Sequence, residues 1–167
     1  MIKTFNSLFV TMFGLGRIKF MPGTIGSLAT TVFLFYLFHS LNVPSNFILI
    51  GLIIIFIYSF YAVSTHIEGN KNKDPKEIII DEFLGQSIPI YLYEISHGIT
   101  KESNEAIVNY ALFFILFRYF DIMKPFPVNF FDKNFKNSFG VIMDDICAGL
   151  YVVLTVVCFM IVKSYVL

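Results

Sequence analysis

Apolar residues fill most of the chain in long runs, and polar residues gather in a few short clusters between them. No charged residue occurs between Lys19 and Glu68. About 20 residues are enough for a helix to cross the hydrocarbon core of a membrane, so this stretch must turn once. The polar turn at residues 42–46 is the natural place. Together with a later apolar run, the pattern predicts helices over residues 27–41, 47–65 and 142–162.

Two further segments are less regular. Residues 78–96 are interrupted by Pro89 and carry Glu94, and residues 106–120 have a short charge-free centre. Each is either a crossing helix or a tilted, re-entrant or protein-buried one. The pattern as a whole predicts an all-α fold, a multi-spanning membrane helix bundle with about four to five apolar helical segments. We expect one domain over residues 1–167.

Composition supports a membrane protein. The chain is 56% hydrophobic, has a mean hydropathy of +0.73, and has 14% charged residues, against about 25% in an average soluble domain. A soluble domain of this size could not hide so much apolar surface. The formal net charge is zero and there is no basic stripe, which argues against nucleic-acid binding. Cys147 and Cys158 have no metal-ligand or disulfide spacing.

The basic residues predict an orientation. With five crossings, all of the 12 Lys and Arg residues except Lys101 and Lys163 fall on one side of the membrane. The side richer in Lys and Arg faces the cytoplasm. The acidic clusters and the glycine-rich segment at residues 14–27 fall on that same side.

Five carboxylates stand at the edges of the apolar segments. Ionised carboxylates at a membrane boundary are costly unless something pairs with them. Carboxylate oxygens are also the ligands that Mg²⁺ prefers, so we expect these acids to converge on one divalent cation. Gly85 and Gly149 each follow an acid by four residues and would let two helices pack closely beneath it. The five acids are Asp81, Glu82, Asp121, Asp144 and Asp145.

Donors for an anion lie near these acids. Arg118 and Lys124 flank Asp121, and the glycine-rich segment adds Arg17 and Thr24. Backbone N–H groups in such a segment can approach a phosphate, although the segment does not match a P-loop. Simpler interpretations exist: the basic residues as interfacial anchors, Asp144 as a helix cap and Glu94 as a solvated acid. The combination favours metal-assisted chemistry on phosphate.

Four motifs carry a family resemblance. GLGRIKFMPGTIGS, IIIDEFLGQ, FRYFDIMKPFP and GVIMDDICAGLY occur in this order between Phe13 and Tyr151. Together they resemble the phosphatidylglycerophosphatase A family, and Lys73-Asp74-Pro75 is also similar to it. Met21 is a departure, since the family usually has Ala there, but it removes no chemical group.

The resemblance implies an activity and a place. It implies Mg²⁺-dependent hydrolysis of phosphatidylglycerophosphate to phosphatidylglycerol and inorganic phosphate, at the cytoplasmic face of the bacterial inner membrane. The partners would be this phospholipid substrate and membrane lipids. The five acids would be metal ligands and catalytic groups, and Arg17, Thr24, Arg118 and Lys124 would bind the substrate phosphate. The role of each acid, the number of metal ions and the oligomeric state stay open.

Two alternative functions belong to other classes of protein. A membrane cation or proton transporter would explain an interfacial carboxylate cluster, but it would want ionisable groups deep in its spans, and residues 47–64 have none. An assembly subunit would explain the hydrophobicity and leave the acidic clustering without a cause.

Overall fold

The structure is a computed structural model that describes residues 2–68, 76–97 and 103–166. Every regular element in that part of the chain is helical, which confirms the all-α prediction. The motif at Lys73-Asp74-Pro75 and the position of Lys101 lie outside the described residues. The helices are α1 (Ile2–Val10), α2 (Pro22–Phe35), α3 (Ser45–Ile67), α4 (Ile80–His97), α5 (Ser103–Met123), α6 (Val128–Asn134) and α7 (Ser138–Val166), with a 3-10 turn η1 (Leu15–Arg17) and a π-helical turn η2 (Tyr36–Ser40).

Prolines mark several helix ends. Pro22 is the first residue of α2, where its missing N–H costs nothing and its fixed φ suits a helix. Helix α2 continues directly into η2, and α3 begins after Pro44, within the turn predicted from the sequence. Helix α5 ends two residues before Pro125, as expected because a proline disfavours helical backbone in the residue before it.

Three helices are long and apolar enough to cross a membrane. They cover Ser45–Ile67, Asn104–Met123 and Ser138–Tyr165. The predicted count of four to five crossing segments is therefore not confirmed. Helix α2 has 14 residues, about 21 Å at 1.5 Å per residue, which is short of the roughly 30 Å hydrocarbon core. Helix α4 carries Asp81, Glu82 and Glu94 within its 18 residues.

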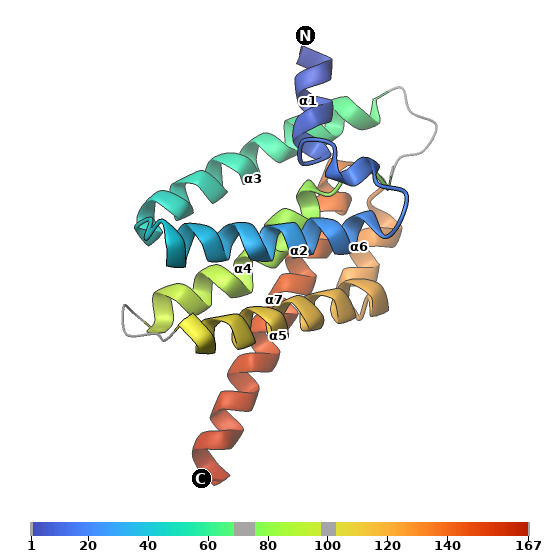
Figure 1. Cartoon of the computed structure of the whole chain (residues 1–167). Coiled ribbons are helices and arrows are strands. Elements are labelled where there is room, and N and C mark those ends of the chain that lie inside the picture. The colour runs from blue at the N-terminus through green and yellow to red at the C-terminus, as the bar shows by residue number, and fades with distance from the viewer. Residues whose placement is uncertain (1, 69–75, 98–102, 167) are drawn as a thin grey trace.

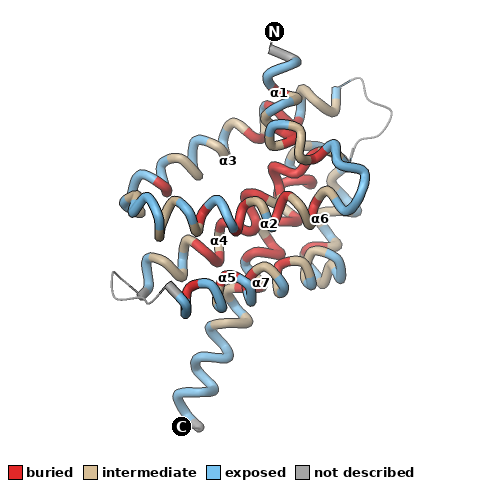
Figure 2. Tube along the Cα trace, viewed as in Figure 1, coloured by how far each residue is buried: buried red, intermediate tan, exposed pale blue. Residues whose placement is uncertain are grey.

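Helix α4 lies at the centre of the arrangement. Helices α2 to α5 run side by side in Figure 1, and α7 crosses them. Helix α4 contacts α2, α3, α5 and α7, and buried positions gather around it in Figure 2. The C-terminal half of α7 extends away from the other helices and exposes apolar side chains such as Leu154 and Phe159.

Two glycines set the spacing between α4 and α7. A Cβ atom at Gly149 would overlap the carbonyl oxygen of Gly85, and a Cβ at Gly85 would overlap the carbonyl oxygen of Asp145. Any larger residue at either position would push the helices apart. The close packing predicted one turn below the acids is confirmed, and it brings the acidic ends of these two helices together.

Candidate active site

Three carboxylates from two helices meet at the crossing of α4 and α7. Asp81 and Glu82 lie in the first turn of α4, and Asp145 lies on α7. Each offers an oxygen atom within 4.8 Å of the others. Asp81 and Asp145 are buried, with Asp145 only 4% exposed. We refer to Asp81, Glu82 and Asp145 as the acidic trio.

Helix α7 begins earlier than the sequence predicts. It starts at Ser138 and has no acid in its first turn, so Asp144 and Asp145 lie in its second turn. The predicted start at residue 142, which would place both acids in the first turn, is wrong. Support from the helix dipole falls off within the first turn, and it does not offset the burial of Asp145.

Asp121 joins the acidic trio from α5. Its carboxylate lies close enough to that of Asp145 for the two charges to repel each other, and its Oδ2 lies 2.5 Å from Nη1 of Arg118, one turn earlier on the same helix. Acids from α4, α5 and α7 thus lie near one another, and three of the five predicted acids form the closest group.

Asp144 has a basic partner of its own. Nζ of Lys124 donates to Oδ2 of Asp144 at 3.0 Å and to Oδ1 of Asp132 at 2.7 Å. Lys124 follows the end of α5 with a positive φ of 44°, and its two bonds tie that end to α6 and α7. A small cavity of about 30 Å³ opens beside these groups and is lined by Asp81, Asp132, Phe135, Lys136, Gly140, Val141 and Asp144.

The local electrostatics penalise ionised acids. Burial, and then the charges of Glu82 and Asp145, raise the pKa of Asp81 well above its usual range. Burial also raises the pKa of Glu82 to about 7, although a hydrogen bond with Asp81 and the charge of Arg118 oppose that rise. Burial lowers the pKa of Lys124, but Asp132 and Asp144 outweigh it and the net pKa is raised. Lys124 is therefore a permanent cation.

The acidic trio fits a hard divalent cation. Within the described part of the chain, no Lys, Arg or His lies within ion-pair distance of Asp81 or Asp145, whereas Asp121 and Asp144 each have such a partner. Oxygen ligands without His or Cys suit Mg²⁺ or Ca²⁺. A cation would remove both the repulsion and the desolvation cost.

The N-terminal end of α2 faces the same acids. A Cβ at Gly23 would overlap Oε1 of Glu82 and would lie 3.2 Å from Nη1 of Arg118. The first N–H groups of a helix have no partner within the helix and attract anions. Several buried side-chain atoms here have no hydrogen-bond partner among the described residues: Thr24 Oγ1, Glu82 Oε2, Arg118 Nε and both amide atoms of Gln86.

Arg17 makes its contacts away from the acidic trio. Its Nη2 donates to Oγ of Ser7 at 2.8 Å, and its Nε lies 4.0 Å from Oε2 of Glu77. Its side chain is 53% exposed. The structure therefore groups Thr24, Arg118 and Lys124 with the acids and leaves Arg17 with other partners.

Sequence reasoning missed two residues at the site. Asp132 lies on α6, a seven-residue helix with no long apolar run beside it, so the signal that marked the other acids was absent. Gln86 is the last residue of the IIIDEFLGQ motif. Its spacing of four from Glu82 was a usable signal, because residues four apart share a helix face.

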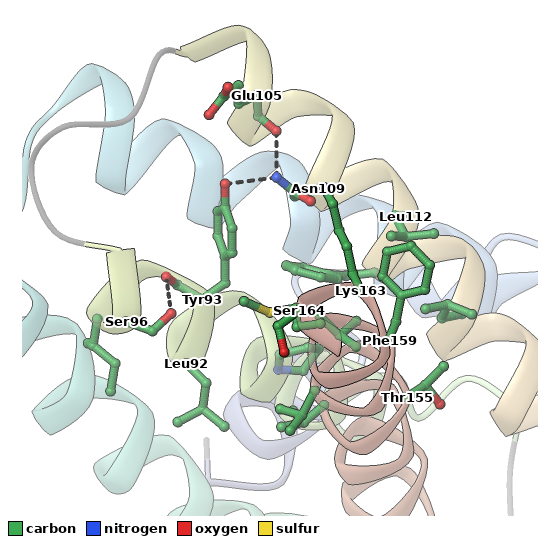
Figure 3. A pocket seen from close by; sticks show the side chains of 18 residues that line it. Leu92, Tyr93, Ser96, Glu105, Asn109, Leu112, Thr155, Phe159, Lys163 and Ser164 are labelled. Carbon is green, nitrogen blue, oxygen red and sulfur yellow. Dashed lines mark hydrogen bonds between the residues drawn. The ribbon is translucent and has the colours of Figure 1, made fainter. Parts of the chain in front are cut away.

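A larger groove lies elsewhere. It has a volume of about 1200 Å³ and runs between α4, α5 and the C-terminal half of α7. Figure 3 shows that its lining is mostly apolar, with polar groups that include Asn109, which donates to the hydroxyl of Tyr93 and to the carbonyl of Glu105. None of the five acids lines it, so it is separate from the acidic trio.

Comparison with known proteins places the chain. The family model for phosphatidylglycerophosphatase A matches residues 8–160. The chain belongs to the phosphatidylglycerophosphatase A family. The four motifs that carried the resemblance all lie within the matched residues, and so do all the site residues named above.

Relatives support the same placement. The chain is 35% identical to a phosphatidylglycerophosphatase A of Haemophilus influenzae over 144 residues, covering 86% of this chain and 82% of the relative. It is 29% identical to the Escherichia coli phosphatidylglycerophosphatase A over 83% of this chain and 73% of the relative. It is also 32% identical to a putative phosphatidylinositol-3-phosphatase of Bacteroides thetaiotaomicron, with 84% of each chain covered. No solved structure matches.

Proposed function

We propose that this protein hydrolyses phosphatidylglycerophosphate to phosphatidylglycerol and inorganic phosphate with Mg²⁺ as its cofactor, in bacterial phospholipid synthesis. Membership of the phosphatidylglycerophosphatase A family supports the reaction. The observation that carries the site is the buried acidic trio beside the N-terminal end of α2. Cation-binding oxygens and anion-binding donors are what a phosphate monoester requires.

The acidic trio would hold the metal. Bound there, Mg²⁺ would neutralise phosphoryl oxygens and make water a stronger nucleophile at neutral pH. Oε2 of Glu82 is buried without a partner among the described residues, so it has lone pairs available to bind a cation. Asp121, close to Asp145 and paired with Arg118, links the metal-binding acids to the phosphate-binding donors.

The phosphoryl group would lie between α2 and α5. Nε of Arg118 and Oγ1 of Thr24 are buried donors without partners in the described part of the chain, and the α2 N–H groups lie next to them. Bonds from an Arg to phosphate oxygens are charge-assisted and strong. Lys124 is already bonded to Asp132 and Asp144, and we assign it to holding α5, α6 and α7 in place while adding positive charge.

We assign proton transfer to Asp144. It lines the small cavity together with Asp81, and a cavity of this size admits a water molecule. The carboxylate of Asp144, held in place by Nζ of Lys124, would take a proton from the attacking water.

The surroundings suit a lipid substrate in a membrane. Basic residues come shortly before the starts of the helices that carry the site: Lys19 before α2, Lys76 before α4, and Lys133 and Lys136 before α7, whereas Lys163 lies near the C-terminal end of α7. Because Lys and Arg are enriched on the cytoplasmic side of membrane proteins, we place the site at the cytoplasmic face of the bacterial inner membrane.

Phosphate release from synthetic lipids tests the function. Purified protein in mixed micelles should release phosphate from phosphatidylglycerophosphate faster than from phosphatidylinositol 3-phosphate or phosphatidic acid. EDTA should abolish the release and Mg²⁺ should restore it. Faster hydrolysis of phosphatidylinositol 3-phosphate would overturn the substrate, and hydrolysis that is insensitive to EDTA would overturn the metal.

A further inference from the structure

Gln86 is a buried amide whose hydrogen-bonding capacity is unused. It lies on α4, is 0% exposed, and neither its Nε2 nor its Oε1 has a partner among the described residues. Burying an amide without hydrogen bonds costs free energy. An apolar side chain of similar size would avoid that cost, so packing alone does not account for glutamine here.

The helix directs Gln86 toward Glu82. Residues four apart lie on the same helix face, and side chains tilt toward the N-terminus of their helix. Gln86 therefore leans over the turn that carries Glu82. Oε2 of Glu82 is a buried acceptor without a partner in the described part of the chain, while Nε2 of Gln86 is a buried donor in the same state. The unsatisfied acceptor of Glu82 and the unsatisfied donor of Gln86 can satisfy each other.

Polar groups next to Glu82 also lack hydrogen-bond partners. Nε of Arg118 and Oγ1 of Thr24 are also buried and unpartnered within the described residues, and Gly23 places the start of α2 against both Glu82 and Arg118. Oε1 of Gln86 can accept from such donors. One buried water held by these groups would make the two to four hydrogen bonds that buried waters usually make.

We propose that Gln86 is a positioning residue for Glu82. Its Nε2–H donates to one buried water that in turn donates to Oε2 of Glu82, and this bridge fixes the carboxylate in the orientation that the cation needs. The inference rests on the proposed metal site and adds a residue that holds one of its ligands. Hydrogen-bonding partners of metal ligands typically change metal affinity by about 10- to 100-fold when they are removed.

Gln86→Met tests the proposal, because methionine keeps the length of the side chain and removes both polar atoms. Binding of Mn²⁺, a paramagnetic probe for the Mg²⁺ site, is measured by electron paramagnetic resonance on the purified protein. We expect affinity to fall about tenfold or more, kcat to fall, and the KM for the lipid to stay the same. Gln86→Asn, which keeps an amide but draws it away from Glu82, should weaken binding as well and serves if the Met variant does not fold.

Ser87→Ala is the matched control. Ser87 is the next residue, is also buried, and donates to the carbonyl of Phe83 within its own helix. Its removal should leave Mn²⁺ affinity unchanged. Equal affinity in wild type, Gln86→Met and Gln86→Asn would overturn the inference.

A double-mutant cycle shows whether Gln86 acts through Glu82. In a Glu82→Gln background, Gln86→Met should change Mn²⁺ affinity by less than about twofold, because the interaction has already been lost. If the double variant instead loses Mn²⁺ affinity by the product of the two single-variant losses, the proposal is contradicted. If wild type binds Mn²⁺ but releases no phosphate, the proposed function fails and this inference stands. If wild type releases phosphate and Gln86→Met equals it in binding and rate, this inference alone fails.

Discussion

Two buried polar clusters occupy opposite ends of α4, and they are built differently. At its C-terminal end, Oε1 of Glu94 lies 3.2 Å from Nε2 of His39 on η2 and accepts a 3.2 Å hydrogen bond from the hydroxyl of Tyr110 on α5. At its N-terminal end, Asp81 and Glu82 face Asp145 and one another.

The difference between the clusters is the supply of hydrogen-bond partners, not burial. The Glu94 side chain is only 10% exposed, so its interpretation as a solvated acid is wrong, yet it has partners from two other elements. Asp81 and Asp145 are as deeply buried and have no basic partner within the described residues. A compensated acid fastens helices together, whereas uncompensated acids in a membrane protein indicate a functional site.

Substitution at the acidic trio should separate the clusters most sharply. Asp145→Asn keeps the shape and removes one charge. Phosphate release should fall by about 100-fold or more, the scale of a single catalytic group. The metal-free variant should melt no lower than wild type, because repulsion is relieved. Wild-type rates in this variant would remove the distinction between the two ends.

Arg118 should come next in effect. Arg118→Ala removes a charged donor between Asp121 and the phosphate site, and a hydrogen bond to a charged group is worth about 1.5–3 kcal/mol. We expect kcat/KM to fall about 10- to 100-fold. Arg118→Lys should restore little, because lysine lacks the planar fork of donors. Full rescue by Lys would show that charge alone is needed.

Low pH should weaken Mg²⁺ binding at the acidic trio, at the N-terminal end of α4. Glu82 has its pKa raised from 4.5 to about 7, so below that pH a proton must leave before a cation can bind. The Mg²⁺ concentration for half-maximal rate should rise as pH falls below 7, by up to about tenfold per pH unit.

The same pKa shift has a consequence for stability. In the metal-free protein the folded state binds more protons than the unfolded state between pH 4.5 and about 7. Stability in EDTA should therefore decrease as pH rises through that window, and Mg²⁺ should restore it. Melting curves in EDTA that do not change with pH would contradict this reading of the acidic trio.

Glu94→Gln should give the smallest effect and one of a different kind. It removes the charge that faces His39 and keeps an acceptor for Tyr110. A loss of about 1 kcal/mol lowers the melting temperature of a chain of this size by about 2–4 °C. The rate per folded molecule should not change. A large loss of kcat would show that Glu94 contributes to catalysis, against this prediction.

Much of the site could be predicted because its residues carry sequence signals. Acids beside apolar runs marked Asp81, Asp121 and Asp145, and a glycine four residues after an acid marked the contact between Gly85 and Gly149. These signals are local, and the physics behind them, desolvation and close packing, acts wherever the residues occur.

The rest depended on tertiary placement. The start of α7 at Ser138 and the burial of Glu94 follow from which helices pack together, which periodicity does not contain. Asp132 reaches the site only because Lys124 joins the end of α5 to α6 and α7. Arg17 has a suitable charge and lies within one of the four motifs, but its side chain donates to Ser7 and pairs with Glu77.

Calorimetric titration with Mg²⁺ tests the central claim most directly, that the uncompensated acids form a cation site and the compensated acid does not. Purified wild type, Asp145→Asn and Glu94→Gln are compared at one pH. We predict saturable binding to wild type, the same affinity in Glu94→Gln, and affinity at least about tenfold weaker in Asp145→Asn. Equal binding by wild type and Asp145→Asn, or no saturable binding to wild type, would contradict the account.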